Sequence, residues 1–150
     1  MSEPTADGEI FYGTLVANGD AGVLLRGASG SGKSDLALRL MGLGGLWRLV
    51  SDDQVVLARV GSNLVGRAPA PIAGKLEVRG IGIIEVENSG VAEIRLIVDL
   101  AARQYVPRLP EPGESEKLLG VAIPRFKLHG FDASSPLKIA LLLRAGSPMH

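Results

Sequence analysis

One eight-residue stretch, residues 27–34, constrains this chain more than any other feature of its sequence. It reads Gly-Ala-Ser-Gly-Ser-Gly-Lys-Ser and fits the G-x-x-x-x-G-K-S/T pattern of a phosphate-binding loop. A short apolar stretch at residues 22–26 precedes it and indicates a buried strand, and leucines at helical spacing follow it. The sequence therefore predicts a loop that joins the end of a strand to the start of a helix.

The chemistry of such a loop comes mainly from its backbone. Glycines allow close wrapping and positive φ, so that N–H groups converge on one anion at the helix N-terminus. Lys33 is expected to reach the β- and γ-phosphates of a nucleotide, and the Ser34 hydroxyl to ligate Mg²⁺. The alternative is a turn that only caps a helix. The residues expected to bind the nucleotide are Gly27, Ala28, Ser29, Gly30, Ser31, Gly32, Lys33 and Ser34.

Composition limits the other classes of function. The 150 residues are the usual size of one domain, and 46% of them are hydrophobic, which predicts a substantial core. Sixteen basic residues balance sixteen acidic ones, which argues against a nucleic-acid-binding protein. With no cysteine and two histidines, a thiolate or histidine-rich metal site is not expected. Without a signal peptide or a membrane-spanning run, we expect a cytoplasmic protein with a loose tail at residues 1–8.

The pattern of the chain predicts strands, loops and two helices. A turn at residues 18–20 joins two strands into a hairpin that leads to the phosphate loop. The last helix, residues 137–144, is apolar nearly all round, so it is either deeply buried or part of a subunit interface. The remaining predicted segments are strands at residues 10–16, 54–60, 64–67 and 94–100, a partly extended glycine-broken stretch at 74–86, a loop at 102–117, and one or two strands at 118–128 divided by Pro124.

Acidic residues at the ends of apolar runs are candidates for chemistry. Asp52 and Asp53 follow one such run, and adjacent carboxylates in an extended segment point to opposite sides. One could take Mg²⁺ while the other faces a reacting hydroxyl; the alternative is a solvated turn. Asp99 ends another apolar strand and competes for the metal, as in a generic P-loop ATPase or GTPase.

A second group of polar residues lies in the glycine-rich stretch. Glu77 and Arg79 are two residues apart and would lie on one side of an extended segment, where they suit a metal-bound phosphate. The alternative is a surface salt bridge. His129 is interpreted as a surface histidine rather than a catalytic one.

Taken together, three motifs resemble the C-terminal catalytic domain of HPr kinase/phosphorylase, over about residues 10–145. They are the phosphate loop, the segment Leu-Val-Ser-Asp-Asp at residues 49–53, and the segment Leu-Glu-Val-Arg-Gly-Ile-Gly-Ile-Ile at residues 76–84. The last of these looks like the family signature and is the most specific. The resemblance implies an α/β fold with a mixed sheet and few helices, a P-loop kinase domain similar to the nucleotide-binding core of phosphoenolpyruvate carboxykinase.

The resemblance also implies an activity and a role for each site residue. The activity is a protein-serine kinase that uses ATP and Mg²⁺ to phosphorylate the phosphocarrier protein HPr, with phosphorolysis of phosphoserine as the reverse reaction. Asp52 would be the general base, with Lys33 and Arg79 stabilising the transferred phosphate. The metal would be held by Ser34, Asp53 and Glu77. Asp99 would then be structural, and a homo-oligomer, with a hexamer as first guess, is expected.

Three departures from the family pattern are visible. The chain resembles a short form without the N-terminal domain of full-length members. Tyr12-Gly13 stands where the family usually has His-Gly, and the family's late basic residue has no clear match around residues 132–134. Two alternatives therefore stay open, a generic P-loop NTPase switch with Asp99 on Mg²⁺ and a non-catalytic nucleotide-binding regulator.

Overall fold

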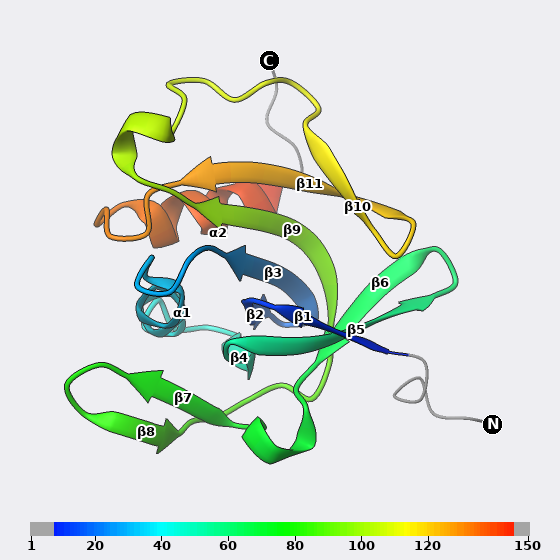
Figure 1. The fold of residues 1–150 in the computed structure, drawn as a ribbon, viewed down its shortest axis with the longest axis vertical. Coiled ribbons are helices and arrows are strands. Elements are labelled where there is room, and N and C mark those ends of the chain that lie inside the picture. The colour runs from blue at the N-terminus through cyan, green and yellow to red at the C-terminus, as the bar shows by residue number, and fades with distance from the viewer. Residues whose placement is uncertain (1–7, 146–150) are drawn as a thin grey trace.

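The computed structural model describes residues 8–145, so the predicted tail lies, apart from Gly8, outside the described residues. Figure 1 shows the arrangement of its strands and helices. In chain order the elements are β1 (Glu9–Tyr12), β2 (Thr14–Asn18), β3 (Ala21–Arg26), α1 (Lys33–Met41), β4 (Trp47–Ser51), β5 (Gln54–Val60), β6 (Asn63–Arg67), the 3₁₀ helix η2 (Ala70–Ile72), β7 (Lys75–Val78), β8 (Gly82–Glu85), β9 (Ala92–Leu100), the 3₁₀ helix η3 (Arg103–Tyr105), β10 (Ser115–Leu118), β11 (Val121–Leu128) and α2 (Ser135–Ala145).

A curled mixed sheet forms the centre of the fold, with strand order β1-β5-β6-β9-β3-β2-β4. The long strand β9 runs parallel to β3 on one side. On its other side it pairs with β6 through its first residues and with β11, again parallel, through its last four. The carboxyl ends of β3, β9 and β11 therefore lie at one edge of the sheet, the edge where α/β proteins bind ligands.

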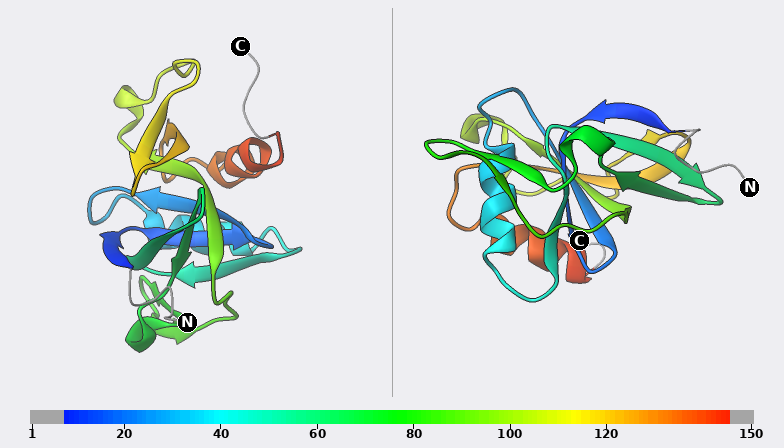
Figure 2. Two further views of the ribbon diagram at one scale, coloured as in Figure 1. Left: turned by 90° about the vertical axis from the view of Figure 1, so that its right-hand side faces the viewer. Right: turned by 90° about the horizontal axis from the view of Figure 1, so that it is seen from below.

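Hydrophobic side chains pack on both faces of this sheet because alternate residues of a strand point to opposite sides. In β3, Val23 and Leu25 belong to the cluster that meets the helices, whereas Leu24 belongs to the cluster under β5 and β6. Leu36 and Leu40 of α1 and Ile139 of α2 are fully buried in the first cluster. The two helices lie side by side on this face (Figure 2).

The structure divides the predicted first strand in two at Gly13. Tyr12 and its predecessors pair with β5, whereas Thr14 and its successors pair with β3 and β4. A Cβ at Gly13 would lie 2.9 Å from the carbonyl oxygen of Leu25, so only glycine fits where the chain changes partners. The prediction of one continuous strand over residues 10–16 was therefore wrong at this position.

Two further boundaries differ from the prediction. The predicted loop at residues 102–117 contains η3 and the start of β10. β11 runs through Pro124 without a break, because this proline lies where the strand leaves β10 and joins β9. The missing N–H of proline is tolerated where a strand has no ladder bond to donate.

The last helix is neither deeply buried nor fully exposed. Ile139 is buried, whereas Leu137 and Leu141 are more than half exposed. The prediction that this helix takes part in a subunit interface stays a prediction. Among the described residues, no helix has the length and apolar character needed to cross a membrane.

An ionic network joins the P-loop strand to the β10–β11 hairpin. Arg26, the last residue of β3, donates to both oxygens of Asp99 at 2.8 and 3.0 Å and to both oxygens of Glu116 at 2.7 and 2.9 Å. Arg125 pairs with the same two carboxylates at 3.2 and 3.1 Å. The hydrogen bonds from Arg26 lower the pKa of Glu116 to about 2 and, in return, raise the pKa of Arg26.

This network predicts how the free energy of unfolding depends on pH. The pKa of Glu116 is lower in the folded protein than in the unfolded chain. Its contribution to the free energy of unfolding is therefore complete at pH values above its unfolded-state pKa and is lost as pH falls through its folded-state pKa. Glu116→Gln should remove roughly 1–2 kcal/mol of this pH dependence between about pH 5 and pH 2, a magnitude reduced for partial exposure.

Urea denaturation at a series of pH values measures this effect. Glu111→Gln, at an exposed position earlier in the same connection, is the matched control and should leave the pH dependence unchanged. Equal pH dependence in the wild type and in Glu116→Gln would contradict a stabilising role for the network.

Candidate active site

The P-loop, residues 27–34, connects the end of β3 to the start of α1, as predicted (Figure 1). Gly30 and Gly32 have φ values of 84° and 101°, a left-handed conformation that favours glycine. In the first backbone hydrogen bond of the helix, the Leu36 N–H donates to the Gly32 carbonyl at 2.8 Å. The N–H groups of the preceding turn therefore lack helical acceptors and can bind an anion.

Two polar side chains of the loop bear on whether it could hold a phosphate chain. The Lys33 ammonium folds back over the loop and donates to the carbonyls of Gly27 at 2.7 Å and Ala28 at 3.3 Å. The Ser31 hydroxyl is buried and has no hydrogen-bond partner among the described residues. The loop thus carries a positive charge and one unpaired hydroxyl among the described residues, in addition to its backbone N–H groups, and these groups suit an anionic phosphate.

Asp52 is the centre of a polar cluster beside this loop. It is only 8% exposed, and three donors from three separate elements hold its carboxylate. The hydroxyls of Thr14 in β2 and Ser34 in α1 donate to Oδ1 at 2.9 and 2.7 Å. The backbone N–H of Glu77 in β7 donates to Oδ2 at 3.1 Å. The position of this carboxylate is therefore fixed, and the interpretation of Asp52 as part of a solvated turn was wrong.

Thr14 is a site residue that the sequence analysis missed. Its hydroxyl is fully buried, donates to Asp52 and accepts a hydrogen bond from the Asp53 N–H at 3.3 Å. The sequence shows only a threonine at the start of an apolar run, with its partner 38 residues away. No local pattern connects the two, so only the pairing of β2 with β4 could have revealed the contact.

Asp53, the next residue, differs from Asp52 in its exposure. Its side chain is exposed, and its backbone has a φ of 72°, in the left-handed region. Its carbonyl accepts a hydrogen bond from the Gly13 N–H at 2.9 Å, which brings the end of β1 beside the Asp-Asp pair. Tyr12 is 72% exposed at this end. Of the two adjacent carboxylates, one is therefore buried and the other exposed, and they lie in a turn rather than in an extended strand.

The glycine-rich stretch forms a separate two-stranded hairpin, β7–β8, which lies beside β4 (Figure 1). Leu76 is fully buried and anchors the hairpin to the core beside α1. Its neighbour Glu77 gives its N–H to Asp52, while the side chains of Glu77 and Arg79 are exposed. In the described part of the chain these two side chains form no ion pair with each other, so the surface salt bridge considered above is not observed.

The cluster offers only oxygen donors. The Ser34 hydroxyl and the Asp52 carboxylate are in contact. The exposed carboxylate of Asp53 belongs to the same turn as Asp52, and that of Glu77 belongs to the hairpin whose backbone donates to Asp52. Hard oxygen ligands of this kind fit Mg²⁺, which completes its shell with water and substrate phosphates. Within residues 8–145, no group of three or more His, Cys, Asp or Glu side chains is arranged to hold a metal.

Asp99 and His129 serve other purposes. Both oxygens of Asp99 accept hydrogen bonds or ion pairs from Arg26 and Arg125, so this carboxylate is committed to the ionic network. His129 is partly buried, with Nδ1 2.9 Å from the Ala101 carbonyl oxygen. Its interpretation as a purely surface residue was therefore incomplete, because it holds the loop after β11 against the loop after β9.

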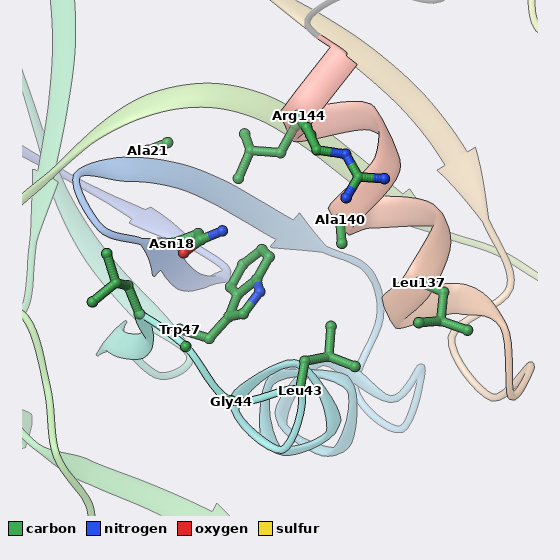
Figure 3. A pocket seen from close by; sticks show the side chains of 11 residues that line it. Asn18, Ala21, Leu43, Gly44, Trp47, Leu137, Ala140 and Arg144 are labelled. Atoms are coloured by element: carbon green, nitrogen blue, oxygen red, sulfur yellow. The ribbon is translucent and has the colours of Figure 1, made fainter.

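A cavity of about 500 Å³ lies away from these residues. It is found at the other end of α1, between the loop that follows this helix, the β2–β3 turn and α2 (Figure 3). Trp47, Leu43, Leu137 and Ala140 line it, with no residue of the P-loop or of the Asp52 cluster. The chemistry-bearing groups therefore gather at the edge of the sheet and not in this cavity.

Comparison with known proteins agrees with this arrangement. An HPr kinase/phosphorylase of Peptoclostridium acidaminophilum is 38% identical over 136 residues, covering 83% of this chain and 44% of that protein. One of Levilactobacillus brevis is 37% identical over 134 residues, covering 82% of this chain and 42% of that protein. The chain thus spans less than half the length of these curated relatives.

A solved structure and a family model complete the comparison. The structure described as the Hpr(Ser) kinase/phosphatase from Coxiella burnetii matches with a TM-score of 0.79 and 28% identity, over 91% of this chain and 95% of that chain, which confirms the predicted fold class. Residues 4–134 match the family model described as the HPr Serine kinase C-terminal domain. Because this match covers most of the chain, the protein belongs to the HPr serine kinase C-terminal domain family.

Proposed function

We propose that this chain is the catalytic core of a kinase that transfers the γ-phosphoryl group of ATP to a serine of an HPr-type phosphocarrier protein. The main support is the buried Asp52 carboxylate, which three donors fix beside the P-loop. A fixed carboxylate next to a phosphate cradle is the arrangement that a hydroxyl acceptor requires. The names of the relatives, which combine kinase with phosphorylase or phosphatase, support phosphate transfer to and from HPr.

In the forward reaction, Asp52 acts as the general base. The seryl oxygen attacks the γ-phosphorus, its proton passes to the Asp52 carboxylate, and the bond from the γ-phosphorus to the bridging oxygen breaks to release ADP. Thr14 and the Glu77 N–H keep the carboxylate in place during this transfer. Lys33 and the P-loop N–H groups bind the β- and γ-phosphates and stabilise the charge that develops on them.

Mg²⁺ supplies charge neutralisation on the phosphates when it is bound. Ser34, Asp53 and Glu77 are proposed to hold it, because the Ser34 hydroxyl contacts Asp52, Asp53 is the next residue in the chain, and Glu77 donates its backbone N–H to Asp52. Arg79, exposed just beyond the end of β7, is proposed to contact the transferred phosphate. Its position in the β7–β8 turn lets a guanidinium approach from the hairpin while Lys33 approaches from the loop.

The same residues can run the reverse reaction. Inorganic phosphate attacks the phosphorus of phosphoserine, the bond to the seryl oxygen breaks, and protonated Asp52 returns its proton to that oxygen. The products are free serine on the carrier and pyrophosphate. Inorganic phosphate and the phosphate of phosphoserine, both anions, must then come together, which requires more positive charge in the site than the forward reaction does.

Other functions receive less support. A generic NTPase switch with Asp99 on Mg²⁺ is disfavoured, because both oxygens of Asp99 are engaged by arginines. A nucleotide-binding regulator without turnover remains the second candidate, since Tyr12 stands at the place of the family histidine. Assembly into a homo-oligomer, with a hexamer as first guess, a cytoplasmic location and a single catalytic domain over the whole chain stay predictions.

The first prediction on function concerns Asp52. Asp52→Asn keeps the shape of the side chain and its capacity to accept from Thr14 and Ser34, but its amide cannot take a proton. Transfer of labelled phosphate from ATP to a purified HPr-type protein should fall by about 10²–10⁴-fold, the usual contribution of a general base, with ATP affinity retained. Asp20→Asn, a charge change in the exposed β2–β3 turn, is the control.

The same assay separates the candidate functions. A generic NTPase would keep its ATP hydrolysis in Asp52→Asn, and a regulator would bind ATP in the wild type without transferring phosphate. Lys33→Ala should weaken ATP binding measured by calorimetry together with transfer. Unchanged affinity and unchanged transfer in that variant would reject the assignment of the P-loop.

A second prediction concerns the metal. Transfer should require Mg²⁺ or Mn²⁺, stop in excess chelator and return when the metal is restored. Glu77→Gln should raise the Mg²⁺ concentration for half-maximal rate by at least about tenfold, the order usual for groups that support a metal site. Glu85→Gln, on the neighbouring strand of the same hairpin, should not. Equal Mg²⁺ requirements in both variants would remove Glu77 from the proposed metal set.

A third prediction concerns the balance of the two directions. Tyr12 lies beside the Asp53 backbone, and a phenol cannot become cationic near neutral pH, whereas an imidazole can. Tyr12→His should therefore raise pyrophosphate release from the phosphorylated carrier relative to phosphorylation by ATP. Tyr105→His, at another exposed tyrosine, is the control. An unchanged ratio in Tyr12→His would show that position 12 does not set the direction.

A further inference from the structure

An exposed aromatic ring lies directly against the P-loop. Phe131 is 54% exposed, and its ring carbons come within 3.1 Å of the position that a Cβ on Gly32 would occupy. A Cβ at Gly32 would press on the ring, and the positive φ of Gly32 also disfavours any other residue at this point of the loop. The same ring meets His129 in an edge-to-face arrangement, with centroids 5.9 Å apart and planes inclined by 68°. A large apolar side chain is thus held at the surface, beside the phosphate cradle, and not inside the core.

The loop that carries this ring, residues 129–134 between β11 and α2, is firmly attached to the P-loop and its helix. Arg39 of α1 donates to the carbonyls of Gly130 and of Asp132, the latter at 3.0 Å. Gly130 approaches the Ser31 carbonyl so closely that a Cβ there would collide with it. Phe131 therefore keeps a fixed position relative to the residues that would bind the phosphates.

A second arginine holds the other side of this loop. Arg103, in the loop that follows β9, donates to Asp132 Oδ1 at 2.8 and 2.6 Å, and this pairing lowers the pKa of Asp132. The Ser135 hydroxyl closes the loop by donating to the His129 carbonyl at 2.6 Å. The loops after β9 and β11 thus form one structure around Phe131.

The order of the strands decides what this ring faces. Asp52 follows β4, on the β2 side of β3, whereas the Phe131 loop follows β11, on the β9 side. The two groups therefore lie on opposite sides of the P-loop. Because Lys33, Ser34 and Asp52 define the end where the γ-phosphate reacts, the nucleoside must leave the loop on the other side, across the carboxyl ends of β9 and β11.

We propose that Phe131 is the platform on which the base of a bound nucleoside triphosphate stacks, with Gly32 leaving room for its ring beside the P-loop. The assignment rests on the proposed nucleotide binding by residues 27–34 and adds the part of the ligand that this motif does not contact. An exposed aromatic face stacks on any nucleobase and binds it without reading its hydrogen-bonding edge. Inorganic tripolyphosphate, which has no base, gains nothing from this ring.

Calorimetry with two probes, ATP and tripolyphosphate, tests the proposal. The wild type should bind ATP more tightly than tripolyphosphate. Phe131→Ala should weaken ATP binding by about tenfold, within the range found when a stacking aromatic is removed, and leave tripolyphosphate binding unchanged. Leu46→Ala, an exposed apolar residue beyond the far end of α1, is the control and should change neither affinity.

A second variant guards against a structural effect of the truncation. Phe131→Trp keeps a stacking face, should retain the affinity for ATP, and should show tryptophan fluorescence that ATP quenches and tripolyphosphate does not. The single natural tryptophan, Trp47, is buried near the other end of α1 and provides the background signal. An equal loss of both probes in Phe131→Ala would show that the ring only supports the P-loop and would overturn the proposal.

Two other results would also overturn it. Unchanged ATP affinity in Phe131→Ala, or wild-type protein that binds tripolyphosphate as tightly as ATP, would show that the base makes no stacking contact. The proposed nucleotide binding itself fails in a different way, because wild-type protein would then bind neither probe.

Discussion

The arrangement of this site depends on a single buried carboxylate. Asp52 receives hydrogen bonds from β2, from the first turn of α1 and from the backbone of β7, so it joins the sheet, the P-loop helix and the separate hairpin. A buried carboxylate is costly unless donors surround it, and each donor that it gains here fixes another element. One charged group therefore joins three elements that also share the apolar cluster containing Leu36 and Leu76.

A second charged group organises the other side of the P-loop. Arg26, the residue before the loop, binds two carboxylates from β9 and β10, and Arg125 of β11 binds the same pair. Strand β3, which leads into the P-loop, thus ends between the cluster around the Asp52 carboxylate and the network around the Arg26 guanidinium. Apolar packing positions β3 within the sheet, and these two clusters position its end.

How much of this could be read from the sequence depends on the range of each interaction. The P-loop was predicted correctly because the glycines, the lysine and the flanking strand and helix are local in the chain, and the strand pattern of residues 54–67 was correct for the same reason. Thr14 escaped prediction because its partner is 38 residues away. The division at Gly13 escaped as well, since it reflects the close approach of a carbonyl from β3. No local sequence pattern pointed to the exposed Phe131, because its position beside the P-loop follows from the order of the strands.

The backbone of Asp53 has a consequence for how this chain can vary. A side chain held at a φ of 72° is strained, and glycine or asparagine would relieve that strain at no cost to the turn. Every such replacement would remove the carboxylate that faces the solvent beside the site. If Asp53 holds the metal as proposed, stability and function favour different residues at this position, and a more stable variant of this turn would be a less active one.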